Sequence, residues 1–509
     1  MPEAVIVATA RSPIGRARKG SLVDIRPDDL TTQIVRAALD KVPSLDPRAI
    51  NDLMVGTGSP AGEQGFNIAR EVAVQLGYDF LPGTTVHRYC ASSLQTTRMA
   101  FHAIKAGEGE VFVSAGVECV SRYDRGSADG WPDTMNPIYT QAQERTAKAA
   151  QGGAPAWTDP READLLPDVY IAMGQTAENV VSMTGISREE QDRWGVLSQN
   201  RAEAAIKAGF FEREITPITL PNGNVVATDD GPRPGTTYEA VSQLRPVFRP
   251  DGTVTAGNAS PLTDGASAVL LMSEEKARAL GFTPLAAFRS WSYVSVDPAD
   301  QVLIGPAVSM PRALDKAGLS LADVDLVDIH EAFAAQTLSV LAALESHEWA
   351  KNRLDRDEAV GAVDVDKLNV HGGAIALGHP WGSTGARLTT TLLNGLAERD
   401  GLAGALRAGG EGQVHRVDPG ALVRLDEVQA RRGGAHQHVP RRGGGHLRLG
   451  PLQDLGAARG GHDDGVVGAG DGGGVRSGHG PTLGAGRAIR PGPGDPKRRI
   501  DIRCSAYLR

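Results

Sequence analysis

Two residues with reactive side chains stand in similar contexts far apart in the chain. Cys90 lies in the run TVHRYCASSLQ (85–95), and His379 lies in HGGAIALGHPWGSTGAR (371–387). Each follows an apolar stretch that predicts a strand and comes before a predicted helix. A thiolate at a helix N-terminus is stabilised by the N–H groups and the dipole there, and a distant histidine can serve as its base once the fold joins the two loops. The pattern predicts acyl transfer through a cysteine thioester.

The neighbours of both residues favour chemistry over simple packing. Most cysteines outside disulfides are small buried core residues, which is the alternative for Cys90. The sequence ASS (91–93) argues against it, because small side chains leave space for an acyl group. His379 stands between Gly378 and Pro380, which indicates a rigid turn rather than a core face. We therefore expect Cys90 to be the nucleophile and His379 to be the base that takes its proton.

Charge is divided unevenly along the chain. The formal net charge of −8 combines −15 in residues 1–400 (36 basic, 51 acidic) with +7 in residues 401–509 (17 basic, 10 acidic). An acidic body gives no electrostatic reason to expect nucleic-acid binding. No run approaches the roughly 18 apolar residues of a membrane span, and the start MPEAVIVATA (1–10) predicts a strand rather than a signal peptide. Few cysteines, one of them a predicted thiolate, indicate a reducing compartment, so we expect a cytoplasmic protein.

Hydrophobic patterns predict an α/β protein with two similar halves. AINDLMVGTG (49–58) and DVDLVDIHEAF (323–333) each indicate a helix end, a buried strand and a polar loop. The helix after the cysteine and the strand EVFVSAGVE (110–118) complete a βαβ unit. Between the halves, residues 121–248 predict an insertion of helices and loops, with an S-x-x-E capping box that begins at Ser187.

Six segments, in family order, resemble the thiolase family. They are VIVATARSPIGR (5–16), VHRYCASSLQ (86–95), MGQTAENV (173–180), RPVFRPDGTVTAGNASPLTDGASAVLLM (245–272), HEAFAAQ (330–336) and HGGAIALGHPWGSTGAR (371–387). HEAFAAQ and the insertion at 345–370 are most similar to the thiolase subunit of fatty-acid β-oxidation multienzyme complexes, whereas biosynthetic acetoacetyl thiolases have NEAF there. The resemblance covers residues 1–400 and implies the duplicated thiolase-like α/β fold, in which two mixed sheets are layered with helices (αβαβα).

The resemblance also implies domain boundaries. Residues 1–272 would form the N-terminal thiolase domain, including the insertion at about 121–248. Residues 273–413 would form an incomplete C-terminal thiolase domain, followed by a Gly/Arg-rich, non-native tail at 414–509.

Site roles follow residue by residue from the resemblance. Cys90 carries the acyl group, His379 takes its proton, and His330 holds a water or donates directly to the thioester oxygen. Coenzyme A is expected on a second set of residues, with Arg233 stacked on adenine, Ala256 and Ser260 along the pantetheine tunnel, and Met173 and Phe333 as apolar walls.

The implied reaction is the cleavage of a 3-ketoacyl-CoA by coenzyme A into acyl-CoA and acetyl-CoA, or the reverse condensation. Coenzyme A is then a substrate, and neither a cofactor nor a metal is expected. The expected partners are acyl-CoA and CoA, with a homodimer or homotetramer as the assembly and a hydratase/dehydrogenase subunit as a further candidate partner.

The end of the chain departs from the family. Thiolases carry a second reactive cysteine in a glycine-rich loop, and that position falls here on Leu406 or Arg407. Residues 401–509 hold 27 of the 62 glycines and sixteen arginines, a composition that cannot bury enough apolar surface to offset its ordering entropy. We favour out-of-frame translation that starts near Asp400; the alternative is a natural disordered, arginine-rich tail. Two functional alternatives stay open, namely an impaired acyl-CoA-binding relic and a decarboxylating condensing enzyme with a Cys–His–His set.

Overall fold

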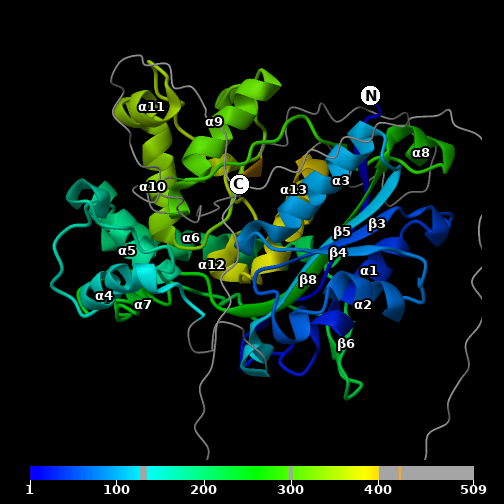
Figure 1. The fold of residues 1–509 in the computed structure, drawn as a ribbon, viewed down its shortest axis with the longest axis horizontal. Coiled ribbons are helices and arrows are strands. Elements are labelled where there is room, and N and C mark those ends of the chain that lie inside the picture. The colour runs from blue at the N-terminus through cyan, green and yellow to red at the C-terminus, as the bar shows by residue number, and fades with distance from the viewer. Residues whose placement is uncertain (126–133, 297–301, 400–423, 426–509) are drawn as a thin grey trace, which may run out of the picture. The chain divides into compact units, whose positions relative to one another are not determined.

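The computed structural model describes residues 1–125, 134–296, 302–399 and 424–425, and its main feature is one mixed sheet (Figure 1). The strand order is β4-β3-β5-β8-β1-β9, with β2 paired to β8. β3 is parallel to β4 and β5, whereas β8 is antiparallel to β5 and β1. The strands of this sheet are β1 (Ala4–Arg11), β2 (Gly15–Arg16), β3 (Asp52–Thr57), β4 (Gly83–Val86), β5 (Val111–Cys119), β8 (Thr263–Ser273) and β9 (Ala286–Ala287).

The central strands are buried on both faces because helices cover each side of the sheet. Every residue of β5 and β8 is buried, which explains why both read as nearly continuous apolar or small-residue runs. Helices α1 and α2 pack on one face, and α3 and α13 lie side by side on the other (Figure 1). These four helices are α1 (Pro27–Leu39), α2 (Ile68–Gln75), α3 (Ser92–Ala106) and α13 (Thr384–Arg399).

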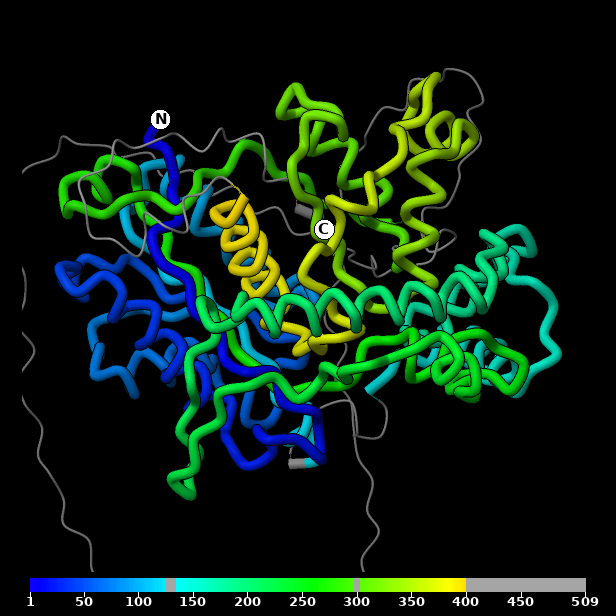
Figure 2. The backbone as a smooth tube through the Cα atoms, turned by 180° about the vertical axis from the view of Figure 1, so that it is seen from behind, coloured from blue at the N-terminus to red at the C-terminus, as the bar shows by residue number. Residues whose placement is uncertain are grey.

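The insertion and the second half are mainly helical in the described residues. Their helices are α4 (Thr140–Ala149), α5 (Met173–Thr184), α6 (Arg188–Lys207), α7 (Tyr238–Ser242), α8 (Glu274–Ala279), α9 (Pro306–Ala317), α10 (Ala334–Glu345), α11 (His347–Leu354) and α12 (Ala374–Leu377). Figure 2 shows α6 from behind as one long helix, and it packs on α12 and α10. The predicted capping box is confirmed, since Ser187 Oγ accepts from Glu190 N and Glu190 Oε2 accepts from Ser187 N.

The second half forms less sheet in the described residues than the resemblance implies. A parallel pair joins β10 (Asp328–Ile329) to β11 (Arg424–Leu425). In the insertion, β6 (Ile218–Thr219) and β7 (Val225–Val226) make a separate hairpin. The chain that follows α13, at 400–423, lies outside the described residues, and so does the predicted tail apart from β11. The position predicted for the second cysteine and Cys504 therefore also lie outside them.

A turn of the second half approaches the main sheet so closely that backbone packs directly on backbone. The 3-10 turn Trp381–Ser383 packs on the ends of β3 and β5. A Cβ on Gly116 would lie 2.2 Å from the Gly382 carbonyl oxygen, and one on Gly382 would lie 2.5 Å from Thr57 Cα. A Cβ on Gly56 would lie 2.5 Å from the Ser92 carbonyl carbon, at the start of α3. Only glycine permits these three approaches.

The glycine contacts predict a sharp packing requirement. Gly116→Ala should destabilise the fold by about 1–3 kcal/mol, because the new methyl group over-packs a rigid contact. Urea unfolding followed by fluorescence measures the change. Gly65→Ala is the matched control, since the nearest atom to its added Cβ is the Gly62 oxygen at 3.1 Å. Equal losses in the two variants would contradict the expected packing requirement.

Candidate active site

Cys90 lies in a strained turn directly before a helix. The 3-10 turn Tyr89–Ala91 runs into α3, and Tyr89 has a φ of 46°, a left-handed conformation that is uncommon for a residue with a bulky side chain. Ser92 Oγ stabilises this turn, because it lies within hydrogen-bond distance of the carbonyls of Tyr89 (2.6 Å) and Thr57 (3.0 Å) and its one proton is shared between them. Cys90 itself is half-buried. The structure thus places the thiol at the N-terminus of α3, where N–H groups favour a thiolate.

His379 is buried, and its hydrogen bonds indicate which ring nitrogen is the base. Its Nδ1 lies 2.7 Å from Thr384 Oγ1, and that hydroxyl lies 3.1 Å from the Pro380 carbonyl oxygen. The hydroxyl has one proton, which the carbonyl accepts, so His379 Nδ1 must donate to Thr384. The proton is then absent from Nε2, which has no hydrogen-bond partner among the described residues. Nε2 is therefore available to accept a proton.

His330 lies against His379 immediately after β10. The two ring centroids are 3.9 Å apart at an angle of 46°, and neither nitrogen of His330 has a partner in the described part of the chain. Burial and the nearby charge of Arg387 lower the pKa of His330 to about 3. Burial, His330 and Arg387 also hold the pKa of His379 well below its ordinary value. Both rings are neutral at physiological pH.

Arg387 is a member of the site that sequence reasoning missed. It lies on α13 three residues after Thr384, so the two share a helix face. Its side chain is 1% exposed, and none of its three guanidinium nitrogens has a hydrogen-bond partner among the described residues. The segment GSTGAR at the start of a helix was the only signal for it. Its fixed positive charge disfavours protonation of both histidines.

The turns that carry Cys90 and His379 are neighbours. The turn Trp381–Ser383, which follows His379, packs on the turn Tyr89–Ala91. Ser93 Oγ accepts from the N–H of Ala386, which joins the first turns of α3 and α13. The fold therefore brings together the two segments that the sequence predicted to act as a pair.

Glu331 is a second group that the sequence analysis did not identify. Its buried carboxylate follows His330 and accepts hydrogen bonds from Trp194 Nε1, Ser198 Oγ, Asn369 Nδ2 and Ile375 N. Burial raises its pKa, whereas these hydrogen bonds lower it. The carboxylate ties the end of β10 to α6 and to the segment that leads to His379, and thereby orients His330.

Residues 255–260 form the predicted pantetheine segment, so called because Ala256 and Ser260 are expected to line that arm of coenzyme A. This segment lies beside the one that carries His330. Ser260 N and Oγ both lie 3.0 Å from the Ala332 carbonyl, and Ala334 N donates to the Asn258 carbonyl. Phe333 is buried and packs edge to face on Phe248, with centroids 6.0 Å apart. Ala256 is exposed and Ser260 half-buried, as residues that face a ligand channel can be.

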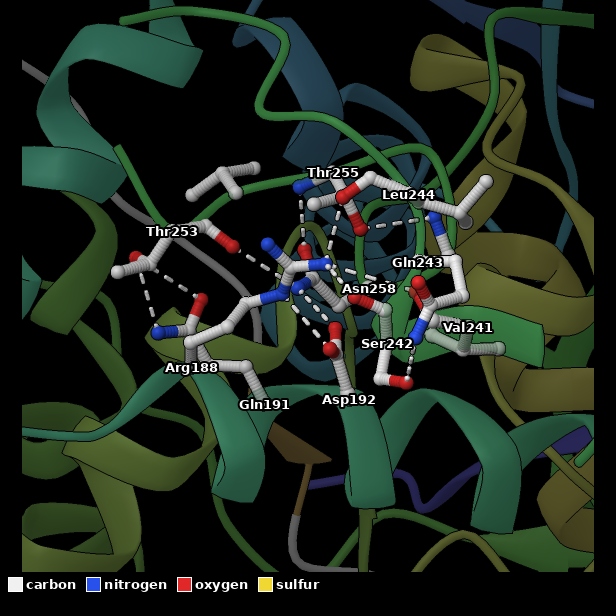
Figure 3. Close-up of polar contacts among 12 residues, drawn as sticks. Arg188, Gln191, Asp192, Val241, Ser242, Gln243, Leu244, Thr253, Thr255 and Asn258 are labelled. Carbon is white, nitrogen blue, oxygen red and sulfur yellow. Dashed lines mark hydrogen bonds and ion pairs between the residues drawn. The ribbon is translucent and has the colours of Figure 1, made fainter. Parts of the chain in front are cut away.

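A polar network fixes the pantetheine segment to α6 (Figure 3). Asn258 Nδ2 donates to Asp192 Oδ1 (2.8 Å), and the other oxygen of that carboxylate accepts from Arg188 Nε (2.7 Å). Arg188 also donates to the Leu244 carbonyl. Thr255 N donates to Asn258 Oδ1 and closes the turn. The loop is therefore rigidly positioned by side chains of α6.

Met173 and Arg233 occupy more exposed positions. Met173 is the first residue of α5 and is exposed, next to Gly174, whose hydrogen faces the Phe248 ring. Arg233 is exposed, and its N–H donates to Gln199 of α6. Gly174, the neighbour of Met173, thus contacts the Phe248 ring that packs on Phe333, whereas the ligand contacts of Met173 and Arg233 stay predictions.

Cys119, the other cysteine among the described residues, differs from Cys90. Cys119 at the end of β5 is buried in the hydrophobic core, and burial raises the pKa of its thiol well above the ordinary value. In the described residues no cluster of three or more His, Cys, Asp or Glu side chains is arranged to hold a metal ion.

Comparison with known proteins gives the same family over both halves. The thiolase N-terminal domain matches residues 4–275, and the thiolase C-terminal domain matches residues 282–417. The 3-ketoacyl-CoA thiolase of Bacillus subtilis (strain 168) is 38% identical over 413 residues, which cover 79% of this chain and 94% of the relative. An acetyl-CoA acetyltransferase of Pseudomonas aeruginosa is 40% identical over 422 residues, or 81% of this chain and 98% of the relative.

Solved structures confirm the predicted fold class. The Bacillus anthracis acetyl-CoA acetyltransferase is similar with a TM-score of 0.64 and 34% identity, covering 79% of this chain and 93% of that one. Human mitochondrial 3-ketoacyl-CoA thiolase has a TM-score of 0.63 and 33% identity, covering 78% and 93%. From its two matched domains, its relatives and its fold, the chain belongs to the thiolase family.

Proposed function

We propose that this thiolase cleaves 3-ketoacyl-CoA with coenzyme A, or runs the reverse condensation, through a thioester on Cys90. The observation that carries the proposal is the buried His379 ring, whose Nε2 has no hydrogen-bond partner among the described residues and whose turn packs on the Cys90 turn. Relatives named 3-ketoacyl-CoA thiolase and acetyl-CoA acetyltransferase support this substrate class. They give no support to the decarboxylating alternative.

In the first step His379 Nε2 takes the thiol proton of Cys90, and the thiolate attacks the 3-keto carbon. The bond between the second and third carbons then breaks, so the acyl group stays on sulfur and acetyl-CoA leaves as a carbanion equivalent that must take up a proton. In the second step the thiol of coenzyme A gives up its proton and attacks the thioester carbonyl; the bond to the Cys90 sulfur breaks, that sulfur regains a proton, and an acyl-CoA two carbons shorter than the substrate is released. Each step develops negative charge on a carbonyl oxygen, which a positioned N–H stabilises.

His330 is suited to stabilise that oxygen. A neutral imidazole carries one N–H, and His330 is held neutral by burial and by Arg387. Neither of its nitrogens is engaged in the described part of the chain, so its N–H is available to a carbonyl of the substrate or to a water. We assign His330 to an oxyanion hole and His379 to proton transfer.

Coenzyme A is expected to enter along the segment that α6 positions. Ala256, Ser260, Met173 and Phe333 would line its pantetheine arm, and Arg233 would meet the adenine. Hydrogen bonds from Ser260 to Ala332 support this placement, because they bring the pantetheine segment next to His330.

The proposal extends to assembly, compartment and pathway. The edge strand β4 has no strand beside it on one side in the described part of the sheet, and exposed Phe66 and Tyr89 flank it, which supports a homo-oligomer. A reactive Cys90 thiol suits a reducing compartment such as the cytoplasm. No helix in the described ranges is long and apolar enough to cross a membrane. We also propose a role in fatty-acid β-oxidation and a hydratase/dehydrogenase partner. Both proposals are based on the resemblance of HEAFAAQ (330–336) to the thiolase subunit of β-oxidation complexes.

The first functional prediction separates acylation from thiolysis. Cys90 should become acylated by a simple acyl-CoA, because that step needs no carbanion. Thiolysis of a 3-ketoacyl-CoA should be slower by about 10²–10⁴, the usual contribution of a positioned acid, since Leu406 and Arg407 supply none. Mass spectrometry and a CoA-ester assay measure the two steps, with Cys119→Ser as the control that keeps the label.

Thiolysis should recover when the residues after Asp400 are replaced by the C-terminal segment of a thiolase that contains the second cysteine loop. The acylation of Cys90 should stay unchanged in that variant. Thiolysis at ordinary enzyme rates in the present chain, about 10 s⁻¹, would contradict the missing-acid account. Acyl label on Cys119 alone would overturn the assignment of the nucleophile.

The second functional prediction concerns pH. The lowered pKa of His379 keeps its ring neutral, and so able to accept a proton, down to low pH. Removing the charge of Arg387 should raise this pKa, so the ring becomes protonated at a higher pH as the pH falls. Arg387→Met should therefore move the acid limb of Cys90 acylation upward by about one pH unit. Replacing a charge that lacks partners among the described residues by an apolar side chain should not unfold the protein. Rates of acyl label uptake between pH 4 and 8 measure the shift.

The exposed Arg193 gives the matched control, and Arg193→Met should leave the acid limb in place. Coincident acid limbs in Arg387→Met and the wild type would mean that Arg387 does not set the protonation of His379.

A further inference from the structure

Glu118 is a fully buried carboxylate that collects five hydrogen-bond donors at the end of β5. It is 0% exposed. Its Oε2 accepts from the backbone N–H groups of Gly58 (2.6 Å) and Gly382 (2.8 Å). Its Oε1 accepts from Gln64 Nε2 (2.5 Å), Thr57 Oγ1 (3.4 Å) and the hydroxyl of Tyr123. Hydrogen bonds to an ionised acceptor are about twice as strong as neutral ones.

One oxygen of Glu118 bridges two segments that are distant in sequence. Gly382 lies in the turn between His379 and Thr384, and Thr384 Oγ1 is hydrogen-bonded to His379 Nδ1 at 2.7 Å. Holding the N–H of Gly382 therefore fixes the turn that sets the position of the His379 ring. Glu118 and Gly382 are 264 residues apart.

The same oxygen holds the end of β3, which supports the Cys90 turn. The N–H of Gly58 donates to Glu118, and the adjacent Thr57 carbonyl accepts from Ser92 Oγ (3.0 Å). Ser92 Oγ also accepts from Arg88 N (2.8 Å). The backbone around Cys90 is thus attached, through Thr57 and Gly58, to the carboxylate that holds the His379 turn.

The glycines at both contacts fit this role. A Cβ on Gly58 would lie 2.7 Å from Glu118 Oε2, and a Cβ on Gly382 would lie 2.5 Å from Thr57 Cα. Side chains at either position would push the backbone N–H groups away from the carboxylate. The contact is therefore built from a buried acid and two residues that allow it to reach the backbone.

We propose that Glu118 is a positioning residue, which holds the turns of Cys90 and His379 at the distance required for proton transfer by binding the N–H groups of Gly58 and Gly382. The inference rests on the proposed function of these two residues. A misplacement of about 1 Å between reacting groups can cost on the order of 10²-fold in rate, so the effect should exceed a change in stability alone.

Glu118→Gln tests the proposal in the full chain. The amide keeps the size of the side chain but removes the charge and replaces one oxygen by an NH₂ group, so either the two N–H groups or the donors of Gln64 and Tyr123 lose their acceptor. Acetyl-CoA serves as the acyl donor, and single-turnover labelling of Cys90 is measured against its concentration. We expect the maximal acylation rate to fall about 100-fold, with a half-saturating concentration close to that of the wild type. Alkylation of Cys90 by iodoacetamide at pH 7 should also slow.

Asp264→Asn is the matched control, because Asp264 is equally buried at the same end of the sheet and accepts from Ser121 N and Oγ instead. It should lose thermal stability and retain the acylation rate. Glu118→Asp is the second variant; it keeps the charge but is one methylene too short to reach both N–H groups, and its acylation should slow as well.

Equal losses of acylation in Glu118→Gln and Asp264→Asn, or a normal rate in Glu118→Gln despite a lower melting temperature, would overturn the positioning role. Failure of the proposed function gives a different result. In that case the wild type takes up no acetyl label, and alkylation by iodoacetamide still compares the variants.

Discussion

The site depends on one close contact, in which the turn Trp381–Ser383 lies directly on the ends of β3 and β5. Gly56, Gly116 and Gly382 allow backbone to approach backbone there, where any Cβ would clash. The contact brings the start of α13 beside the start of α3, so the two reactive turns rest on the same edge of the sheet. Protein interiors are close-packed and rigid, so the ends of β3 and β5 fix the positions of both turns.

Burial gives the side chains of the site their chemical character. His330 and His379 are buried beside the cation of Arg387, so desolvation and charge act in the same direction and keep both rings neutral. The two buried carboxylates differ from the histidines in that Glu118 and Glu331 each accept hydrogen bonds from several donors. The neutral histidines keep nitrogens available to a substrate, whereas the carboxylates are fully used in holding backbone and side chains in place.

Helix α6 organises the predicted coenzyme side of the site. Arg188 and Asp192 fix the pantetheine segment through Asn258, and Trp194 and Ser198 bind Glu331 next to His330. One helix therefore positions the predicted ligand channel and His330, a histidine of the proposed site, together. A rigid element between binding and reacting groups is what lets binding of a long ligand orient the reacting carbon.

The sequence alone predicted Cys90 and His379 as the reactive pair, because their signals are local: a turn with small residues before a helix, and a Gly-His-Pro turn. It also determined the family, the layered α/β class and the capping box at Ser187, which depend on short segments. Arg387, Glu118 and Glu331 were decided only by the tertiary structure. Their roles come from burial and from partners far away in the chain, such as Gly382 for Glu118, and neither burial nor a long-range hydrogen bond has a local sequence pattern.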